Sequence, residues 1–203
     1  MYGAIEAGGT KFVCAVGNDR FEVIEKVTFP TTTPIETFRQ VFGFFDRFRL
    51  DAIGIGSFGP IDVNRQSATY GYILNTPKKA WINTDFVGRI QEKYSIPVGW
   101  TTDVNMAALA EAEKGAGVGL DSVLYLTVGT GIGGGAVVQG RILEGFSHPE
   151  MGHVLVRRHP EDSFAGHCPS HGDCLEGLAA GPTMEARLGR KGSEIDPDHR
   201  IWD

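Results

Sequence analysis

Two glycine-rich loops, each lying between two apolar runs of strand type, constrain the fold of this chain more than any other feature. The first loop reads Gly8-Gly9-Thr10-Lys11 and separates residues 2–7 from residues 12–16. The second begins Gly129-Thr130-Gly131 and separates residues 123–128 from residues 132–138. Glycine lets consecutive backbone N–H groups form a concavity that binds phosphate oxygens. The repeated unit therefore predicts two phosphate-binding hairpins and points to an internal duplication.

Each loop also has a plainer interpretation. The first could be a tight hairpin turn with Lys11 exposed to water. The second contains a match to the dinucleotide fingerprint at Gly129, Gly131 and Gly134, but that fingerprint requires a helix after the glycines. Residues 136–138 continue as a strand instead, which argues against a Rossmann oxidoreductase. A purely structural turn stays open, although three consecutive glycines are costly without a ligand.

The remaining apolar patterns alternate between strands and helices, which predicts an α/β protein. Thr33 is placed to cap a helix over residues 34–48, with Pro34 at its first position. Further strands are expected at residues 21–30, 52–57, 97–101 and 141–143, and further helices at residues 85–94, 104–114 and 184–188. A glycine-rich break at residues 115–119 predicts two domains: an N-terminal α/β domain at residues 1–115 and a partial second α/β domain at residues 116–203.

Composition argues against several classes of partner. The 203 residues carry a net charge of −6 and no block of Lys or Arg, so neither nucleic acid nor an anionic membrane is an expected partner. The N-terminus lacks the basic start and long apolar run of a secretory signal, and no apolar stretch is long enough to cross a bilayer. Three cysteines without such a signal indicate reduced thiols or a metal site. We therefore expect a cytoplasmic protein.

A group of metal-type ligands lies near the end of the chain, where Cys168, His171 and Cys174 follow one another at three-residue intervals. Thiolate together with imidazole favours Zn²⁺ over the other common ions. A closed structural zinc site needs four ligands, so one more must come from elsewhere in the chain. The candidates are His153, His148, His159 and His167. The alternative is two reduced cysteines and a solvated histidine.

Three carboxylates and a histidine complete the set of candidate site residues. Asp103 follows a predicted strand and precedes a predicted helix, where it is placed either to take a proton as a general base or only to cap the helix. Glu6 lies next to the first glycine loop, where a carboxylate can meet a Mg²⁺–phosphate complex. Glu150 and His153, three residues apart, can share one site or can both be surface groups.

These motifs occur in the same order in the ROK family of sugar kinases and sugar-responsive repressors, which the chain resembles from Tyr2 to about Pro182. The first family motif is Asp-x-Gly-Gly-Thr-Lys, and here Glu6 replaces the Asp. The family zinc region reads Cys-x-Cys-Gly-x-x-Gly-Cys-x-Glu, of which the last Cys and the Glu match Cys174 and Glu176. The variant Cys-Pro-x-His-Gly-x-Cys-x-Glu-Gly found here, together with Glu6, resembles the bacterial zinc-containing fructokinase branch.

The resemblance implies an actin-like (ribonuclease H-like) ATPase fold, in which two α/β domains with mixed sheets surround a cleft. It also implies ATP-dependent phosphorylation of a hexose, D-fructose to fructose 6-phosphate, with Asp103 as the catalytic base. The implied sugar contacts are Gly59, Pro60, Asn75, Asp103, Glu150, His153 and Glu176. The implied contacts to ATP with Mg²⁺ are Glu6, Gly8, Gly9, Thr10, Lys11, Gly129, Thr130 and Gly131. The implied ligands of a structural Zn²⁺ are His153, Cys168, His171 and Cys174, with His153 using its other ring nitrogen for the sugar.

The resemblance further implies a homodimer and leaves rival functions open. Family kinases are considerably longer and include an adenine-binding region, so a C-terminal part is expected to be missing here. Residues 1–203 alone are then expected to bind ATP weakly and to phosphorylate little sugar. A glucokinase or an N-acetylmannosamine kinase is the nearest rival. A non-catalytic sugar-sensing regulator is less favoured, because family repressors carry an N-terminal DNA-binding region, for which a strand beginning at Tyr2 leaves no room.

Overall fold

The computed structural model describes residues 1–196 and residue 198. Its first half is built on a five-stranded mixed sheet with the strand order β3-β2-β1-β4-β7. The strands are β1 (Tyr2–Ala7), β2 (Lys11–Gly17), β3 (Val23–Pro30), β4 (Ala52–Ser57) and β7 (Val98–Thr102). β1, β2 and β3 form an antiparallel meander, whereas β4 and β7 run parallel to β1. The carboxyl ends of β1, β4 and β7 therefore meet at one edge, where open α/β sheets bind their ligands.

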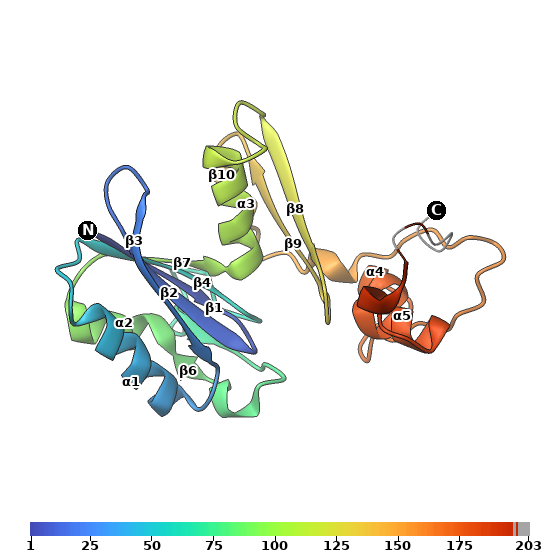
Figure 1. Cartoon of the computed structure of the whole chain (residues 1–203), viewed down its shortest axis with the longest axis horizontal. Coiled ribbons are helices and arrows are strands. Elements are labelled where there is room, and N and C mark those ends of the chain that lie inside the picture. Colours follow the sequence, from blue (N-terminus) through green and yellow to red (C-terminus); the bar gives the residue numbers. More distant parts are fainter. Residues whose placement is uncertain (197, 199–203) are drawn as a thin grey trace.

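Two helices, α1 (Pro34–Phe45) and α2 (Phe86–Tyr94), cover one face of this sheet (Figure 1). The Thr33 side chain caps α1 by accepting a hydrogen bond from the Glu36 N–H, as the sequence predicts. The Asp85 side chain caps α2 in the same way. Because β1 and β2 bury every second residue, their covered face is apolar along its whole length.

Aromatic side chains fill the space between the first sheet and its helices. Phe12 of β2 stacks on Trp81, with ring centres 5.4 Å apart, and Phe38 of α1 meets Phe86 of α2 edge-on at 4.9 Å. The adjoining segments are the two short strands β5 (Tyr72–Ile73) and β6 (Thr84–Asp85) and the 3₁₀ turn η1 (Lys79–Trp81). This packed core makes the edge that carries β1, β4 and β7 a rigid base for a site.

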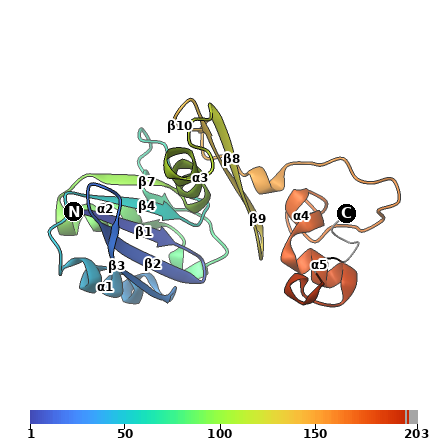
Figure 2. The same ribbon diagram turned by 45° about the horizontal axis from the view of Figure 1, so that its top comes forward.

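Helix α3 (Asp103–Lys114) follows β7 without an intervening loop and lies between the first sheet and a second, three-stranded antiparallel sheet (Figure 1 and Figure 2). On one side Met106 packs against Gly56 of β4. On the other, a Cβ on Gly135 would overlap the Val104 carbonyl, so glycine is needed for this close approach. The strands of the second sheet are β8 (Ser122–Val128), β9 (Ile132–Val138) and β10 (Arg141–Ile142).

The described chain beyond β10 consists of short helical segments joined by loops. They are η2 (Met151–His153), α4 (Leu175–Ala179), α5 (Gly181–Leu188) and η3 (Gly192–Glu194). In Figure 1, α4 and α5 stand beyond the β8–β9 hairpin, on the side away from α3. The second domain predicted at residues 116–203 includes residues 197 and 199–203, which lie outside the described residues. The predicted domain boundary near residue 115 stays a prediction.

The mixed α/β architecture confirms the predicted fold class, and every predicted strand is present within one or two residues of its expected limits. The helix predicted over residues 34–48 ends at Phe45, because the next residues turn so that the Phe48 N–H donates to the Phe45 carbonyl. The pair β5–β6 and helix α4 were not predicted. Among the described residues, no helix combines the length and the apolar character needed to span a membrane.

Candidate active site

One cleft brings the two glycine loops together. It has a volume of about 540 Å³ and lies between the carboxyl edge of the first sheet and the tip of the β8–β9 hairpin. The loop after β1 forms one wall and the loop between β8 and β9 forms the other, so the two similar units face each other. Twelve of the predicted site residues line it: Glu6, Gly8, Gly9, Thr10, Lys11, Gly59, Asp103, Gly129, Thr130, Gly131, Glu150 and Glu176.

The first glycine loop is held in shape by its own backbone and by the end of β3. The Gly8 N–H donates to the Lys11 carbonyl at 3.0 Å, and the Thr31 hydroxyl donates to the Gly8 carbonyl at 2.6 Å. A Cβ on Gly8 would lie 2.7 Å from the Lys11 oxygen, so a side chain there would open the turn. The loop is therefore preorganised before any ligand arrives, which favours tight binding of a phosphate.

The second glycine loop is tied to the C-terminal helices. The Gly129 N–H donates to the Gly131 carbonyl at 2.9 Å, and the Gly129 carbonyl accepts from the Gly181 N–H at 2.7 Å. The Glu176 carboxylate accepts a hydrogen bond from the Ile132 N–H at 3.0 Å, just past the loop. α4, which carries Glu176, is thereby fixed against the loop. A second cavity of about 540 Å³ adjoins the loop and shares Gly129 and Thr130 with the cleft.

Asp103 lies at the junction of β7 and α3, with its carboxyl group in the cleft. The side chain that caps α3 is that of Thr102, which accepts from the Asn105 N–H at 3.2 Å, so Asp103 does not provide the cap. Burial raises the pKa of Asp103. The hydrogen bond that Asp103 Oδ1 accepts from the Val104 N–H at 2.9 Å lowers the pKa and so offsets part of this rise. The charges of Glu6 and Glu150 raise it further. A half-buried carboxylate with a raised pKa is suited to accept a proton.

Three predicted sugar contacts, Pro60, Asn75 and His153, are not among the described residues that line the cleft. The Leu74 N–H donates to the Pro60 carbonyl, which places the exposed Asn75 beside the Gly59–Pro60 turn. Conversely, His148 lines the cleft but was considered from sequence only as a metal ligand. Its position two residues before Glu150 was the one signal that could have suggested a place in the cleft.

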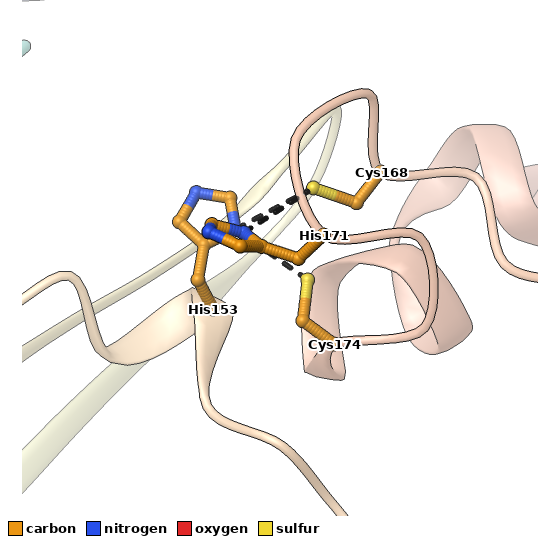
Figure 3. A group of neighbouring side chains, drawn as sticks. All are labelled: His153, Cys168, His171 and Cys174. Atoms are coloured by element: carbon orange, nitrogen blue, oxygen red, sulfur yellow. Dashed lines mark hydrogen bonds between the residues drawn. The ribbon is translucent and has the colours of Figure 1, made fainter.

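The predicted metal ligands meet at one point. The ligand atoms of His153, Cys168, His171 and Cys174 all lie within 4.8 Å of one another, and Figure 3 shows the four side chains pointing toward one another. His153 Nδ1 lies 3.5 Å from Cys174 Sγ and 3.7 Å from Cys168 Sγ. A tetrahedral zinc with two sulfur and two nitrogen ligands places neighbouring S and N atoms about 3.6 Å apart. Both the donor set and its spacing therefore fit Zn²⁺.

Local backbone contacts explain why these four residues converge. Cys168 and Gly172 exchange backbone hydrogen bonds at 3.1 and 2.9 Å, which folds the segment carrying His171 into a tight turn. Cys174 is the residue before α4, and the Leu175 N–H donates to the Val154 carbonyl at 2.9 Å, which brings His153 alongside. The other candidate histidines lie elsewhere: His148 bonds to the Ile61 N–H, for example.

Comparisons with known proteins find relatives along nearly the whole chain. Residues 2–201 match the ROK family. The chain is 51% identical over 208 residues to the fructokinase of Streptococcus mutans, covering all of this chain and 70% of that protein. It is also 51% identical over 203 residues to the fructokinase of Lactococcus lactis subsp. cremoris, covering all of this chain and 69% of the relative.

The structure resembles a ROK family glucokinase from Streptomyces griseus in complex with glucose and AMPPNP. The TM-score is 0.71 at 26% identity, and the match covers 90% of this chain and 58% of the glucokinase chain. The chain thus spans about 70% of the length of the two fructokinases and less than two thirds of that glucokinase. Together with the two facing glycine loops and the carboxyl group between them, the match over residues 2–201 shows that this chain belongs to the ROK family.

Proposed function

We propose that the protein is an ATP-dependent sugar kinase that phosphorylates D-fructose to fructose 6-phosphate. The observation that carries the proposal is the cleft in which a half-buried carboxyl group, Asp103, faces two glycine loops. The two fructokinases that share 51% of their aligned residues with this chain support fructose, whereas the glucokinase of known structure shares 26%.

In the proposed reaction the 6-hydroxyl oxygen of the sugar attacks the terminal phosphorus of ATP and ADP leaves. Asp103 accepts the hydroxyl proton as the new P–O bond forms, which is the role its position and raised pKa support. Closure of the cleft around both substrates would exclude water and so suppress hydrolysis of ATP.

The two glycine loops hold the phosphates of ATP in this scheme. Gly8, Gly9 and Thr10 offer backbone and hydroxyl donors from one wall, and Gly129, Thr130 and Gly131 face them from the other. Lys11 adds a positive charge at the same edge. Glu6 supplies a carboxylate for a Mg²⁺ ion, which when bound to ATP neutralises part of the phosphate charge. The cavity that adjoins Gly129 leaves room for the nucleoside part.

The zinc site serves the sugar indirectly. Zn²⁺ held by His153, Cys168, His171 and Cys174 would fix the His153 ring through Nδ1, while Nε2 points away from the two thiols (Figure 3). It would also anchor the start of α4, and with it Glu176, whose carboxylate lies in the cleft. One ion thereby orients two of the proposed sugar contacts, which is how residues around a metal commonly act on a neighbouring site.

A panel of sugars with the complete protein tests the proposal. ADP production is followed with D-fructose, D-glucose and N-acetylmannosamine, and the 6-phosphate product is identified. We expect the largest kcat/KM with fructose. A larger kcat/KM with glucose or N-acetylmannosamine would show that the protein is a sugar kinase with a substrate other than fructose. No phosphorylation of any sugar, with sugar binding retained, would instead favour a non-catalytic sugar sensor. A cytoplasmic homodimer is proposed for the same protein, and sedimentation of the complete chain tests the dimer.

A further inference from the structure

His148 is a buried histidine at the end of an exposed loop. Residues 143–147 between β10 and η2 are all exposed, including Phe146, whereas His148 retains 8% of its exposure. A buried imidazole is stable only if its ring nitrogens find polar partners. The metal cluster does not supply them, because its ligands are His153, His171 and the two cysteines.

Both ring nitrogens of His148 have partners, and the partners come from the two halves of the chain. Nε2 accepts a hydrogen bond from the buried Ile61 N–H at 3.2 Å, across 87 residues of sequence. Nδ1 lies 3.5 Å from the Glu150 carboxylate. A neutral imidazole that accepts through Nε2 must carry its proton on Nδ1, so this nitrogen donates toward Glu150. At 3.5 Å this is a charge–dipole contact longer than a hydrogen bond, of the kind that shortens into a hydrogen bond when the substrate is bound.

The ring also lies beside Gly59, the cleft residue that follows β4. A Cβ on Gly59 would lie 3.5 Å from His148 Cε1, so the imidazole occupies the space beside this glycine and leaves room for little more than a methyl group. Ile61, two residues on, is fully buried and bridges to Ile73, which anchors this side of the contact. Through the Ile61 N–H, His148 therefore links the segment that carries Gly59, in the first half of the chain, to Glu150, in the second.

Glu150 needs such a partner. Its side chain is 58% exposed and His148 is its one ion-pair partner among the described residues. A solvated carboxylate samples many rotamers, so binding the sugar would cost the conformational entropy that this side chain loses when it is ordered. An imidazole N–H at 3.5 Å restricts those rotamers before the sugar arrives.

We propose that His148 is a positioning residue for the sugar, which aims the Glu150 carboxylate into the cleft and fixes it relative to Gly59. The inference rests on the proposed function, in which Glu150 contacts the sugar. It assigns His148 no contact with ATP and no part in proton transfer.

Two conservative variants distinguish the role of His148 Nε2 from that of His148 Nδ1. In His148→Gln the side-chain amide reaches the position of Nε2 and can accept from the Ile61 N–H, but it leaves Glu150 without a donor. In His148→Asn the amide lies at the position of Nδ1 and can donate to Glu150, but it leaves the Ile61 N–H unpaired. His148→Ala removes both contacts, and His159→Gln, at an exposed histidine, is the matched control.

Steady-state kinetics of the complete protein with D-fructose and ATP, together with thermal unfolding, test the inference. For His148→Ala and His148→Gln we expect the fructose KM to rise about tenfold or more, the loss of one hydrogen bond to a charged group, with the ATP KM within about twofold. For His148→Asn the fructose KM should stay within about threefold of wild type, while its unfolding temperature falls below that of His148→Gln.

A purely structural histidine would show the opposite order, with His148→Gln restoring both stability and KM, and that result would overturn the inference. So would an unchanged fructose KM in His148→Gln, or an equal rise in the KM values for fructose and ATP. If His148→Ala does not fold, the Gln and Asn variants still decide. Failure of the proposed function is a separate outcome, because it would appear as absent fructose phosphorylation in the wild-type protein.

Discussion

Replacing Asp103 by Asn removes the proposed base and leaves its surroundings intact. The two side chains have nearly the same volume, and the Asn oxygen can still accept the hydrogen bond that Oδ1 takes from the Val104 N–H at 2.9 Å. What is lost is the ability to accept a proton. General-base catalysis contributes about 10²- to 10⁴-fold, so we expect kcat to fall by that factor, or about 3–5 kcal/mol in the barrier.

The same substitution should not destabilise the protein, and the sign follows from the raised pKa. Burial, with the charges of Glu6 and Glu150, holds the pKa of Asp103 above its value in the unfolded chain. The folded state therefore binds more protons in the interval between the two pKa values, and stability is lost as the pH rises through it. Asp103→Asn never ionises, so at pH 7 its unfolding temperature should equal or exceed that of wild type.

A coupled assay of ADP production with varied sugar and ATP, and thermal unfolding at pH 7, check both expectations. Glu113→Gln is the matched control, since it removes a carboxylate from an exposed position on the same helix, α3. A variant that keeps more than a tenth of the wild-type kcat would refute the assignment of the base. A loss of kcat accompanied by a large fall in unfolding temperature would refute the argument about stability.

Three further predictions follow from the same site. Glu6→Gln should move the acid limb of the pH–kcat profile to lower pH, because the Glu6 charge helps to raise the pKa of Asp103; an unmoved limb would count against this coupling. Cys174→Ser should release zinc, measured by metal analysis, and raise the sugar KM about 10- to 100-fold and the ATP KM much less; equal losses would mean that the ion only holds the structure together. Gly135→Ala should cost about 1–3 kcal/mol in thermal unfolding, because its Cβ would overlap the Val104 carbonyl; unchanged stability would show that α3 can shift freely.

The parts of the site that sequence reasoning located are those determined by local chemistry. Apolar alternation on both sides of a glycine loop places each loop at a hairpin tip, and a strand followed directly by a helix places Asp103 at the edge of a sheet. Even the role of Thr33 as the cap of α1 follows from the residues beside it. These features need no knowledge of the tertiary structure.

Features that depend on tertiary contacts were harder to predict. Four histidines were candidates for the fourth metal ligand, and the contact between the segments after His153 and Cys174 decides among them. The five residues of α4 are too few for a helical pattern to emerge, and the helix ends where Gly181 bonds to Gly129. The two partners of His148, Ile61 and Glu150, lie 89 positions apart in the sequence, so sequence spacing alone could not predict these contacts.

The direct passage from β7 into α3 has a mechanical consequence. Because no loop separates Thr102 from Asp103, the first sheet and the helix that supports the second sheet share a single peptide link at this point. If the two halves rotate about that link, the displacement of any atom grows with its distance from the axis. Asp103 and the neighbouring start of β9, where Gly133 lies against Val104, then move least, while the parts of each half that lie far from the link travel farthest. Such a pivot would let the outer parts of the two halves shift while Asp103 keeps its position in the cleft.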